Sequence, residues 1–554
     1  MSQNSLENLL QWSKSHGAYF DNVDNVEFTL NDDKGVYGIL KHEVNFDEPL
    51  IIVPEALFIT PEMATEFFGL DNPVDDLGLL LLAKLKFDRT ETLINGNSLS
   101  KMYEPYIAFL PSTCLEIGLP LFWSDHEKEL LKGTDAYPKL RQKREELFEK
   151  WRSLMSLLNE KRPDLVMEGT PLYKESRSWK SFEAYSWAYS IYCTRAFPNF
   201  LRKQSERSLN IGFLCPIVDL LNHKNGEKVT WSFEDNNFVF KSSAKCIKRG
   251  EEVYNNYGSK SNTELLLNYG FVLDGNESET TTLTLKVEDE VIEAGIKFGL
   301  KLPLGTSSSG LSFDLSLATP LPKELIRFMG FLHQLTSEKN QYTLRMHLEG
   351  LSKLRDILAS RITTFKTWKI EENVNTNKKV IELVKRYRSS QKSLFQRAYE
   401  LCDSTEKSLI RKFKPLTLRK ALTLDPEFDN CLIFIFGTNE VNEIEKKGFS
   451  DQVLLLFIMR CRNLKPARDS PLRFIHDTYE NVSTTIEITR EDVLEYSDLY
   501  HSLFPYLSHK FPEIFAVGDY SAKSMIIAGT VVDRIVFKRK VNGELYLLRK
   551  IILE

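Results

Sequence analysis

Cysteine is scarce in this chain of 554 residues, and its pattern argues against two classes of site. The seven cysteines are widely scattered, odd in number and form no C-x-x-C pair. A disulfide framework or a structural zinc site is therefore not expected, and a reducing compartment fits best. The nine histidines show no H-x-x-x-H spacing, so we predict no metal site.

Long apolar runs are also lacking. The longest, such as Val453 to Met459, are too short to span a bilayer. The first five residues contain neither a basic n-region nor an apolar h-region, so no secretion signal is predicted. We expect no membrane partner, and a location in the cytoplasm that extends to the nucleus.

A strong charge of either sign is missing as well. The formal net charge is -5 and the pI is about 6.1, which argues against a basic nucleic-acid binder, so no direct nucleic-acid binding is expected. Hydrophobic residues make up 42% of the chain and charged residues 27%, as in soluble globular proteins. Single cores stop growing well below this length, so at least two domains are predicted.

The periodicity of apolar residues changes several times along the chain. It predicts a short helix near Leu6 to Trp12, strands near 26–30 and 50–53, and a largely helical stretch over about 61–190. Alternation at 229–240 around Glu234-Asp235-Asn236-Asn237 predicts a hairpin. A loop is expected at 304–310, long helices over 344–362 and 380–401, and strands at 531–537 and 544–548.

Three short segments combine residues able to carry chemistry. They are Thr194-Arg195-Ala196-Phe197, then Pro216-Ile217-Val218-Asp219-Leu220-Leu221-Asn222-His223, then Gly250-Glu251-Glu252-Val253-Tyr254-Asn255-Asn256-Tyr257-Gly258, which runs on to Asn268-Tyr269-Gly270-Phe271. Each has an ordinary structural explanation when taken alone. Asn222-His223 could close a loop, Arg195 could form a surface ion pair, and Glu251-Glu252 reads as a solvated turn. Tyr257 and Tyr269 could be half-buried core tyrosines.

The order and spacing of these segments resemble the SET-domain methyltransferases of the Rubisco large-subunit methyltransferase type. The resemblance is strongest over about Trp187 to Phe271 and weaker over Leu6 to Thr60. It implies an α+β fold: short β-sheets with a pseudoknot, a helical insertion over about 61–190, and a mostly α-helical C-terminal lobe. The implied domains are a SET domain over 1–290 and a substrate-binding lobe over 291–554, in which Tyr387 to Lys392 and Thr417 to Leu422 look like parts of the lobe. For any single residue there we favour a scaffold role.

The resemblance also implies a cofactor, S-adenosyl-L-methionine. Its carboxylate would suit the forked donors of Arg195. Asn222 and His223 match the pair that binds its amino-acid and adenine portions, and Phe271 matches the residue that packs on adenine. Upstream, Glu48 and Leu50 fall where the family contacts the cofactor. A departure lies at Gly35-Val36-Tyr37-Gly38, where the family has a Gly-x-Gly-Leu turn and this chain has Tyr37 for the second glycine.

Lysine methylation needs a neutral amine, and a free lysine with a pKa of about 10.4 is mostly protonated at neutral pH. An apolar channel beside a sulfonium disfavours the ammonium form. Tyr257 is the candidate catalytic tyrosine and also a cofactor contact. Tyr254 and Tyr269 are candidates for the wall of the lysine channel, and Asp219 would help orient the lysine.

Two other functions remain open at this point. A related branch methylates histidine, but it tends to carry a polar amide where this chain has Ala196 and to lack a tyrosine at the position of Tyr269. A SET fold that has lost activity would be a binding module. The expected enzyme is a protein-lysine N-methyltransferase whose partner is a non-histone protein, and fungal relatives point to a ribosomal protein or a translation elongation factor.

Overall fold

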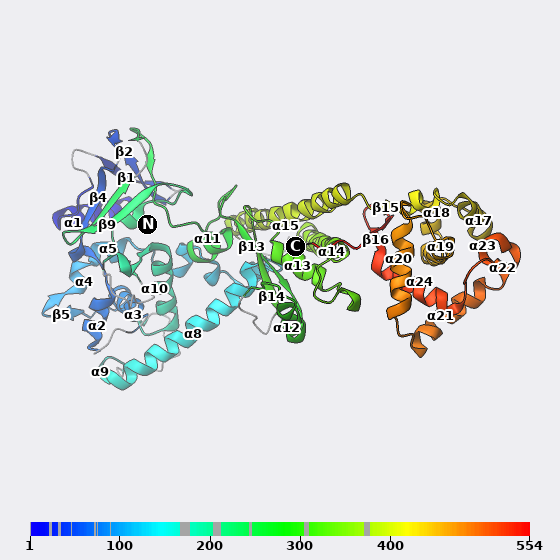
Figure 1. Ribbon diagram of the computed structural model, residues 1–554. Helices are drawn as coiled ribbons and strands as arrows, with labels where there is room; N and C mark the ends of the chain where they lie inside the picture. Colours follow the sequence, from blue (N-terminus) through cyan, green and yellow to red (C-terminus); the bar gives the residue numbers. More distant parts are fainter. Residues whose placement is uncertain are drawn as a thin grey trace. The chain divides into compact units, whose positions relative to one another are not determined.

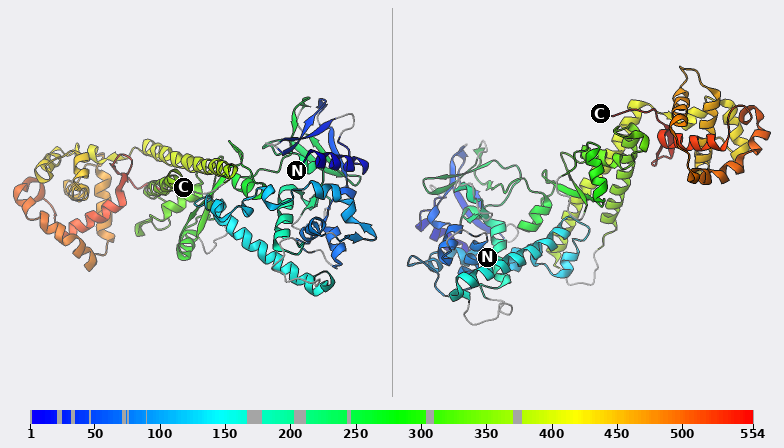
Figure 2. Two further views of the ribbon diagram at one scale, coloured as in Figure 1. Left: turned by 180° about the vertical axis from the view of Figure 1, so that it is seen from behind. Right: turned by 60° about the horizontal axis from the view of Figure 1, so that its bottom comes forward.

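The computed structural model describes residues 2–20, 25–31, 35–45, 47–70, 74, 76–88, 90–166, 178–202, 212–242, 246–303, 310–369 and 377–553. The chain divides into two compact units. Figure 1 labels its helices and strands, and Figure 2 gives two further views of the ribbon. Unit 1 comprises Met1–Thr281 and Thr367–Lys392, and unit 2 comprises Thr282–Lys366 and Ser393–Glu554. Of the loop predicted at 304–310, only Gly310 lies within the described residues.

Small sheets form the β part of unit 1. One has the strand order β1-β2-β12 and another the order β4-β10-β9, all antiparallel. The strands predicted near 26–30, 50–53 and 229–240 are confirmed. The bounds are β1 Val26–Asn31, β2 Gly35–Leu40, β3 Val44–Asn45, β4 Pro49–Pro54, β7 Ala196–Phe197, β8 Phe213–Leu214, β9 Val229–Glu234, β10 Asn237–Ser242, β11 Cys246–Ile247 and β12 Glu252–Val253.

The hairpin between β9 and β10 forms because its turn residues accept a left-handed backbone. Asp235 and Asn236 have φ angles of 49° and 61°, and a two-residue turn of this kind matches the twist of the flanking strands. The stretch Gly35 to Gly38 lies in strand β2 rather than in a turn. At Gly38 an added Cβ would come within 2.9 Å of Val26 Cγ1 and 3.2 Å of a Leu221 methyl, so this glycine allows the sheet to pack against the segment that leads to Asn222.

Helices cover these sheets and share one apolar core with them. Helix α3 has leucine on every side, and all of Leu77 to Leu85 is buried, as expected for a helix enclosed by protein. It packs against α10. The bounds are α1 Gln3–Ser15, α2 Pro61–Phe68, α3 Leu77–Phe87, α4 Leu99–Met102, α5 Glu104–Phe109, α6 Cys114–Ile117, α7 Asp125–Glu129, α8 Ala136–Lys161, α9 Pro163–Val166, α10 Phe182–Arg195 and α11 Asn262–Tyr269, with the short strands β5 Leu93–Ile94 and β6 Asn97–Ser98.

Helix α11 is fixed at both ends by its own sequence. Ser261 and Glu264 form a reciprocal capping box at its start, and Gly270, with φ 76°, ends it. Its first residues are held by α15 (Lys378–Phe413), whose residues up to Lys392 belong to unit 1. The Tyr387 hydroxyl lies 2.8 Å from Thr263 Oγ1 and accepts a hydrogen bond from Ala136 N at 3.1 Å.

Unit 2 is mostly helical. Helices α14 and α15 pack with β13 and β14 around one apolar cluster, and α17, α19, α20 and α24 enclose another. The bounds are β13 Thr280–Leu285, α12 Asp289–Lys297, β14 Leu311–Ser316, α13 Lys323–Phe331, α14 Leu344–Thr367, β15 Leu416–Thr417, α16 Leu418–Leu422, α17 Pro426–Phe436, α18 Val441–Lys446, α19 Ser450–Leu464, α20 Arg473–Thr485, α21 Arg490–Leu503, α22 Tyr506–Lys510, α23 Pro512–Phe515, α24 Ala522–Ile535, β16 Val536–Arg539 and β17 Glu544–Leu547.

One predicted strand in unit 2 is wrong. Val531 to Ile535 are the last residues of helix α24, and the strand β16 begins only at Val536. The β-branched residues favour a strand locally, but Val531 and Ile535 are buried against the other helices of this cluster, and tertiary packing overrides that preference. Among the helices described, none is both long and apolar enough to cross a membrane.

We expect Tyr387→Phe to loosen α11, because the change removes the partner of the Thr263 hydroxyl on this helix and also leaves the buried Ala136 N–H of α8 without its acceptor. Loss of such a hydrogen bond costs about 1–3 kcal/mol of stability when a buried partner is left without another hydrogen bond. Amide hydrogen exchange should show the opening free energy of α11 falling by that amount. Tyr399→Phe on the same helix is the matched control, since no hydrogen bond of the Tyr399 hydroxyl is seen among the described residues. Equal protection of α11 in both variants would contradict the anchoring role.

Candidate active site

Two loop segments of unit 1 meet side by side, as the predicted pseudoknot requires. Asn255 N donates to the carbonyl of Asn222 at 2.7 Å, and Lys224 N donates to the carbonyl of Asn255 at 3.0 Å. The resulting bridge between His223 and Asn255 is parallel. Backbone hydrogen bonds therefore hold the Asn-His motif and the tyrosine motif together, although about thirty residues separate them in the chain.

The backbone just before this junction is strained. Ile217, fully buried, has φ 77° and ψ -54°, a combination that a β-branched residue rarely adopts. Such conformations cost of order 1–3 kcal/mol and persist where the surrounding structure enforces them. The strained turn leads directly into the 3₁₀ helix η4 (Val218–Leu220), which carries Asp219.

Four aromatic side chains gather at the junction. His223 stacks on Tyr257 with ring centroids 4.9 Å apart, and Tyr257 stacks on Tyr269 at 4.9 Å. Phe271 lies beside this stack, 6.3 Å from His223 and 6.2 Å from Tyr269. The structure thus brings together four of the predicted site residues in one aromatic group. Two of them are positioned by the end of α11, which carries Tyr269, and by its glycine cap, which precedes Phe271.

The Tyr257 hydroxyl is fixed at the base of this stack. It donates to the carbonyl of Leu221 at 2.8 Å. Burial raises the pKa of Tyr257 above the ordinary value for a tyrosine, against the opposing effect of the Arg195 charge. Burial also raises the pKa of Tyr269 to about 12. Both hydroxyls therefore stay protonated at neutral pH, and neither can act as a general base there.

A buried ion pair lies next to the tyrosines. Arg195 Nη1 donates to Asp219 Oδ2 at 3.1 Å and to the Asp219 carbonyl at 3.2 Å. The Tyr106 hydroxyl, from helix α5, donates to the same carboxylate oxygen at 2.8 Å. Burial raises the pKa of Asp219, while Arg195 and Tyr106 oppose that rise. Sequence reasoning identified Arg195 and Asp219 but missed Tyr106, which lies in the helical insertion and carries no motif.

These residues border a cavity of about 490 Å³. Its wall includes the predicted residues Arg195, Asp219, Tyr257 and Tyr269. Residues that the sequence analysis did not single out complete it: Thr194, Ala196, Phe197, Pro198, Leu201, Val229, Trp231, Asn255, Asn256, Gly258 and Lys260. The Trp231 indole N–H donates to Asn255 Oδ1 at 3.1 Å. Aromatic and aliphatic side chains share its wall with polar and charged ones, among them Arg195, Asp219 and Lys260.

Among the predicted site residues that do not line this cavity are Tyr254, Glu48 and Leu50. Tyr254 does not line the cavity, and its hydroxyl donates to Glu252 Oε2 at 2.8 Å. Glu48 is exposed and accepts a hydrogen bond from Asn45 N at 3.2 Å. Leu50 is buried in the core on strand β4. Neither of the last two lines the cavity, and their predicted cofactor contacts stay predictions.

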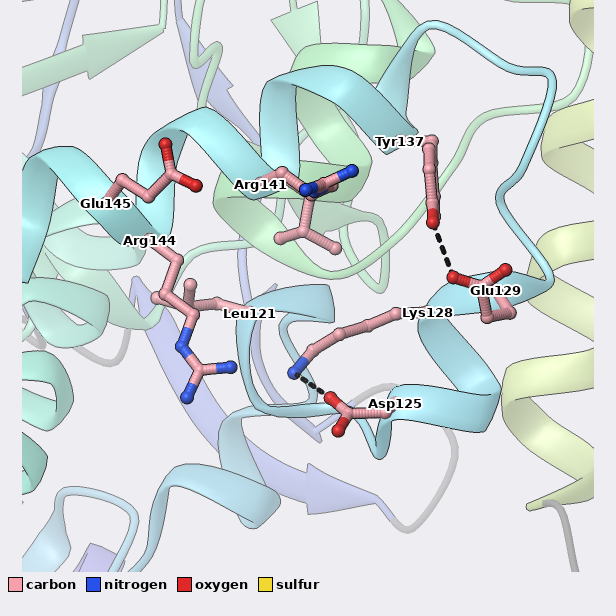
Figure 3. A pocket seen from close by; sticks show the side chains of 9 residues that line it. Leu121, Asp125, Lys128, Glu129, Tyr137, Arg141, Arg144 and Glu145 are labelled. Atoms are coloured by element: carbon pink, nitrogen blue, oxygen red, sulfur yellow. Dashed lines mark hydrogen bonds and ion pairs between the residues drawn. The ribbon is translucent and has the colours of Figure 1, made fainter.

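A second cavity, of about 460 Å³, lies along α7 and the first turns of α8 (Figure 3). Its wall carries both signs of charge. Lys128 pairs with Asp125 at 3.5 Å, and the Tyr137 hydroxyl donates to Glu129. Asp125, Arg141, Arg144 and Glu145 are exposed, and none of the lining residues belongs to the predicted motifs. Within the described residues no cluster of three or more His, Cys, Asp or Glu side chains could hold a metal ion.

Comparison with known proteins identifies this arrangement. Residues 280–413 match the family model described as the EFM1 middle domain. The protein-lysine N-methyltransferase EFM1 of Saccharomyces cerevisiae is 32% identical, over 99% of this chain and 99% of its own length. The chain belongs to the EFM1 family.

More distant relatives agree on the fold. Ribosomal lysine N-methyltransferase 1 of Saccharomyces cerevisiae is 25% identical over 88% of this chain and 92% of its own. The solved structure of Rubisco LSMT bound to sinefungin and monomethyllysine has a TM-score of 0.55 at 18% identity, covering 74% of this chain and 94% of that one. An actin-histidine N-methyltransferase of Gallus gallus is 24% identical over 62% of this chain and 54% of its own length.

Membership of the EFM1 family confirms three predictions. The fold is α+β of the SET type, with small sheets and a helical C-terminal region. The chain is a protein-lysine N-methyltransferase, and S-adenosyl-L-methionine is its methyl donor. The histidine methyltransferases are similar over a smaller share of both chains, which leaves that alternative weaker.

The pH dependence of stability tests the contact between His223 and Tyr257 at the junction. Its Nδ1 accepts a hydrogen bond from Tyr257 N at 3.0 Å, which a protonated ring cannot do. Burial lowers the pKa of His223, so the unfolded chain takes up this proton first as pH falls. Stability from the neutral ring is complete above about pH 6.5 and is lost as pH falls through the folded pKa. We expect His223→Asn to reduce the fall in melting temperature of unit 1 between about pH 6.5 and pH 5. An identical pH dependence in both proteins would contradict this.

Proposed function

We propose that this chain methylates a lysine on a protein of the translation apparatus, a ribosomal protein or an elongation factor, with Tyr257 as the catalytic residue. The observation that carries the site assignment is the position of Tyr257. This residue lines the cavity, its backbone N–H donates to His223 Nδ1, and its ring stacks on the His223 ring. The substrate class is supported by the names of the relatives, a ribosomal lysine N-methyltransferase among them.

The side chains around the junction fit the methyl donor. His223 Nδ1 accepts from Tyr257 N, so a neutral ring carries its proton on Nε2, and this buried nitrogen has no partner among the described residues. Arg195 uses Nη1 for Asp219, which leaves its other donors for a carboxylate. When bound, S-adenosyl-L-methionine supplies a methyl group on a sulfonium. We propose that Arg195, Asn222, His223 and Phe271 bind it; Glu48 and Leu50 stay candidates for contacts at its edge.

The cavity beyond the tyrosines would receive the lysine. Entry into this cavity would remove water from the amine and so disfavour its ammonium form, which lowers the pKa of the lysine. Tyr257 stays neutral, and its hydroxyl donates its hydrogen bond to the Leu221 carbonyl. The hydroxyl oxygen can then accept a hydrogen bond from the amine and orient it. Positioning of this kind supplies much of the rate of an in-line displacement. Asp219 and Tyr254 are proposed to support the lysine channel.

The assignment of roles to the two halves follows the same proposal. Residues 1–290 would carry catalysis, and residues 291–554 would hold the protein substrate. The match of residues 280–413 to the EFM1 middle domain supports a distinct family-specific region after the catalytic motifs. We place the protein in the cytoplasm, with access to the nucleus. Six of the seven cysteines are seen as free thiols, which fits a reducing compartment: Cys114, Cys193, Cys215, Cys402, Cys431 and Cys461.

Proteomic comparison of lysine methylation in cells with and without this protein would identify the substrate. We expect the loss of methylation at a lysine of a ribosomal protein or an elongation factor. Mass spectrometry of the same peptide separates lysine from histidine as the modified residue. Binding of the donor without transfer to any extract protein would show an inactive module and refute the proposal.

For Tyr257→Phe we expect turnover to fall about 100-fold or more, since one preoriented polar group in a catalytic site is worth that much. Affinity for S-adenosylhomocysteine should be kept, because the ring stack remains. Tyr192→Phe is the control: it removes another buried hydroxyl of unit 1, one that has no partner among the described residues and does not line the cavity. Unchanged turnover in Tyr257→Phe would remove this residue from its role.

A further inference from the structure

Glu252 connects two residues of the candidate site. One of its carboxylate oxygens, Oε1, accepts a hydrogen bond from Asn222 Nδ2 at 2.9 Å, and the other, Oε2, accepts one from the Tyr254 hydroxyl at 2.8 Å. The sequence suggested that Glu251 and Glu252 form a solvated turn. That holds for Glu251, which is exposed and accepts from Lys248 N, whereas Glu252 is half-buried.

The position of Glu252 is set by the sheet. Strand β12 pairs with β2, so that Glu252 lies opposite Ile39 and Val253 opposite Gly38. The carbonyl of Glu251 also accepts a hydrogen bond from Leu40 N at 3.0 Å. The Glu252 side chain reaches Asn222 from the first residue of this strand, whereas the Glu251 carboxylate, one residue before the strand, turns back to accept from Lys248 N.

The contact with Glu252 decides how the Asn222 amide is turned. An ionised carboxylate only accepts hydrogen bonds, so Asn222 must present Nδ2 to it, whichever way the amide is drawn. The amide oxygen then faces the other way, and it accepts no hydrogen bond from the described residues. The Asn222 carbonyl is held as well, by Asn255 N. Asn222 is thus fixed at its backbone and its side chain, with one acceptor left over.

We propose that Glu252 is a positioning residue that fixes the Asn222 amide so that Oδ1 accepts a hydrogen bond from the ammonium group of the methyl donor. This inference rests on the proposed role of Asn222 in donor binding. It explains why a carboxylate, and not an amide, occupies position 252. A glutamine would offer one oxygen to two donors, the Tyr254 hydroxyl and Asn222 Nδ2, and the Asn222 amide could then turn its Nδ2 toward the ammonium.

The test compares a ligand that has the amino-acid portion of the methyl donor with one that lacks it. S-Adenosylhomocysteine carries the amino-acid portion with its ammonium, and 5′-methylthioadenosine keeps the adenosine and the thioether but lacks that portion. Calorimetry of the full chain should show Glu252→Gln losing about tenfold in affinity for S-adenosylhomocysteine, the effect of one hydrogen bond to a charged group. Affinity for 5′-methylthioadenosine should be unchanged. Glu251→Gln, the same chemical change one residue away, should leave both affinities as they are.

A double variant separates amide orientation from damage to the fold. Adding Tyr254→Phe to Glu252→Gln removes the competing donor, so the glutamine oxygen can accept from Asn222 and affinity for S-adenosylhomocysteine should recover. Equal loss for both ligands, no loss for either, or no recovery in the double variant would each overturn the positioning role. If the unmodified chain binds neither ligand, the proposed function itself fails; if it binds both and Glu252→Gln changes nothing, only the role of Glu252 fails.

Discussion

The backbone hydrogen bonds between the Asn222-to-Lys224 segment and Asn255 hold the rest of the site together. They bring the imidazole of His223, which follows the Asn222 amide in the chain, onto the ring of Tyr257, although the two residues come from loops that follow different strands. Side chains alone could not do this, because long polar side chains lose conformational entropy when they are ordered. When the backbone itself is held, ordering a single segment positions all the side chains attached to it, so less additional conformational entropy is lost. The strained conformation of Ile217 is one sign that the surrounding structure enforces this geometry.

The site combines a polar junction with a cavity whose wall is partly aromatic, and in the proposed reaction the two parts serve different needs of methyl transfer. Hydrogen-bonding groups gather at Asn222, His223 and Arg195, the residues that we propose bind the zwitterionic donor. On the other side, Phe197, Trp231 and Tyr269 give the cavity its aromatic wall, which also includes Asp219 and Lys260. Tyr257 stands between the two parts. With its proton engaged by a backbone carbonyl, it takes part as a neutral dipole, which is the form that an uncharged amine can approach without repulsion.

Much of this site could be predicted from the sequence, because motif order identifies Arg195, Asp219, Asn222, His223, Tyr257, Tyr269 and Phe271, and the structure places these residues at one junction. The remainder depends on strand pairing. Trp231 reaches the cavity only through the β9-β10 hairpin, and Tyr106 only through the packing of the helical insertion. Two adjacent glutamates look alike in a sequence, and the register of β12 alone separates Glu252 from Glu251. Helix α24 shows the same limit of sequence-based prediction. Its last residues are β-branched, and their helical conformation depends on the neighbouring helices that they pack against.

The anchoring of α11 has a consequence for dividing this protein into parts. The residues that hold its first turn are Tyr387, Ser390 and Gln391, which contact Thr263 and Asn262 from more than a hundred residues further along the chain. A fragment that ends near residue 290 would contain every catalytic motif and still lack this support. Its polar groups at Asn262 and Thr263 would be left without their partners, and Tyr269 would sit on a loosened helix. Truncation at the apparent motif boundary would therefore give a weakened enzyme rather than a minimal one.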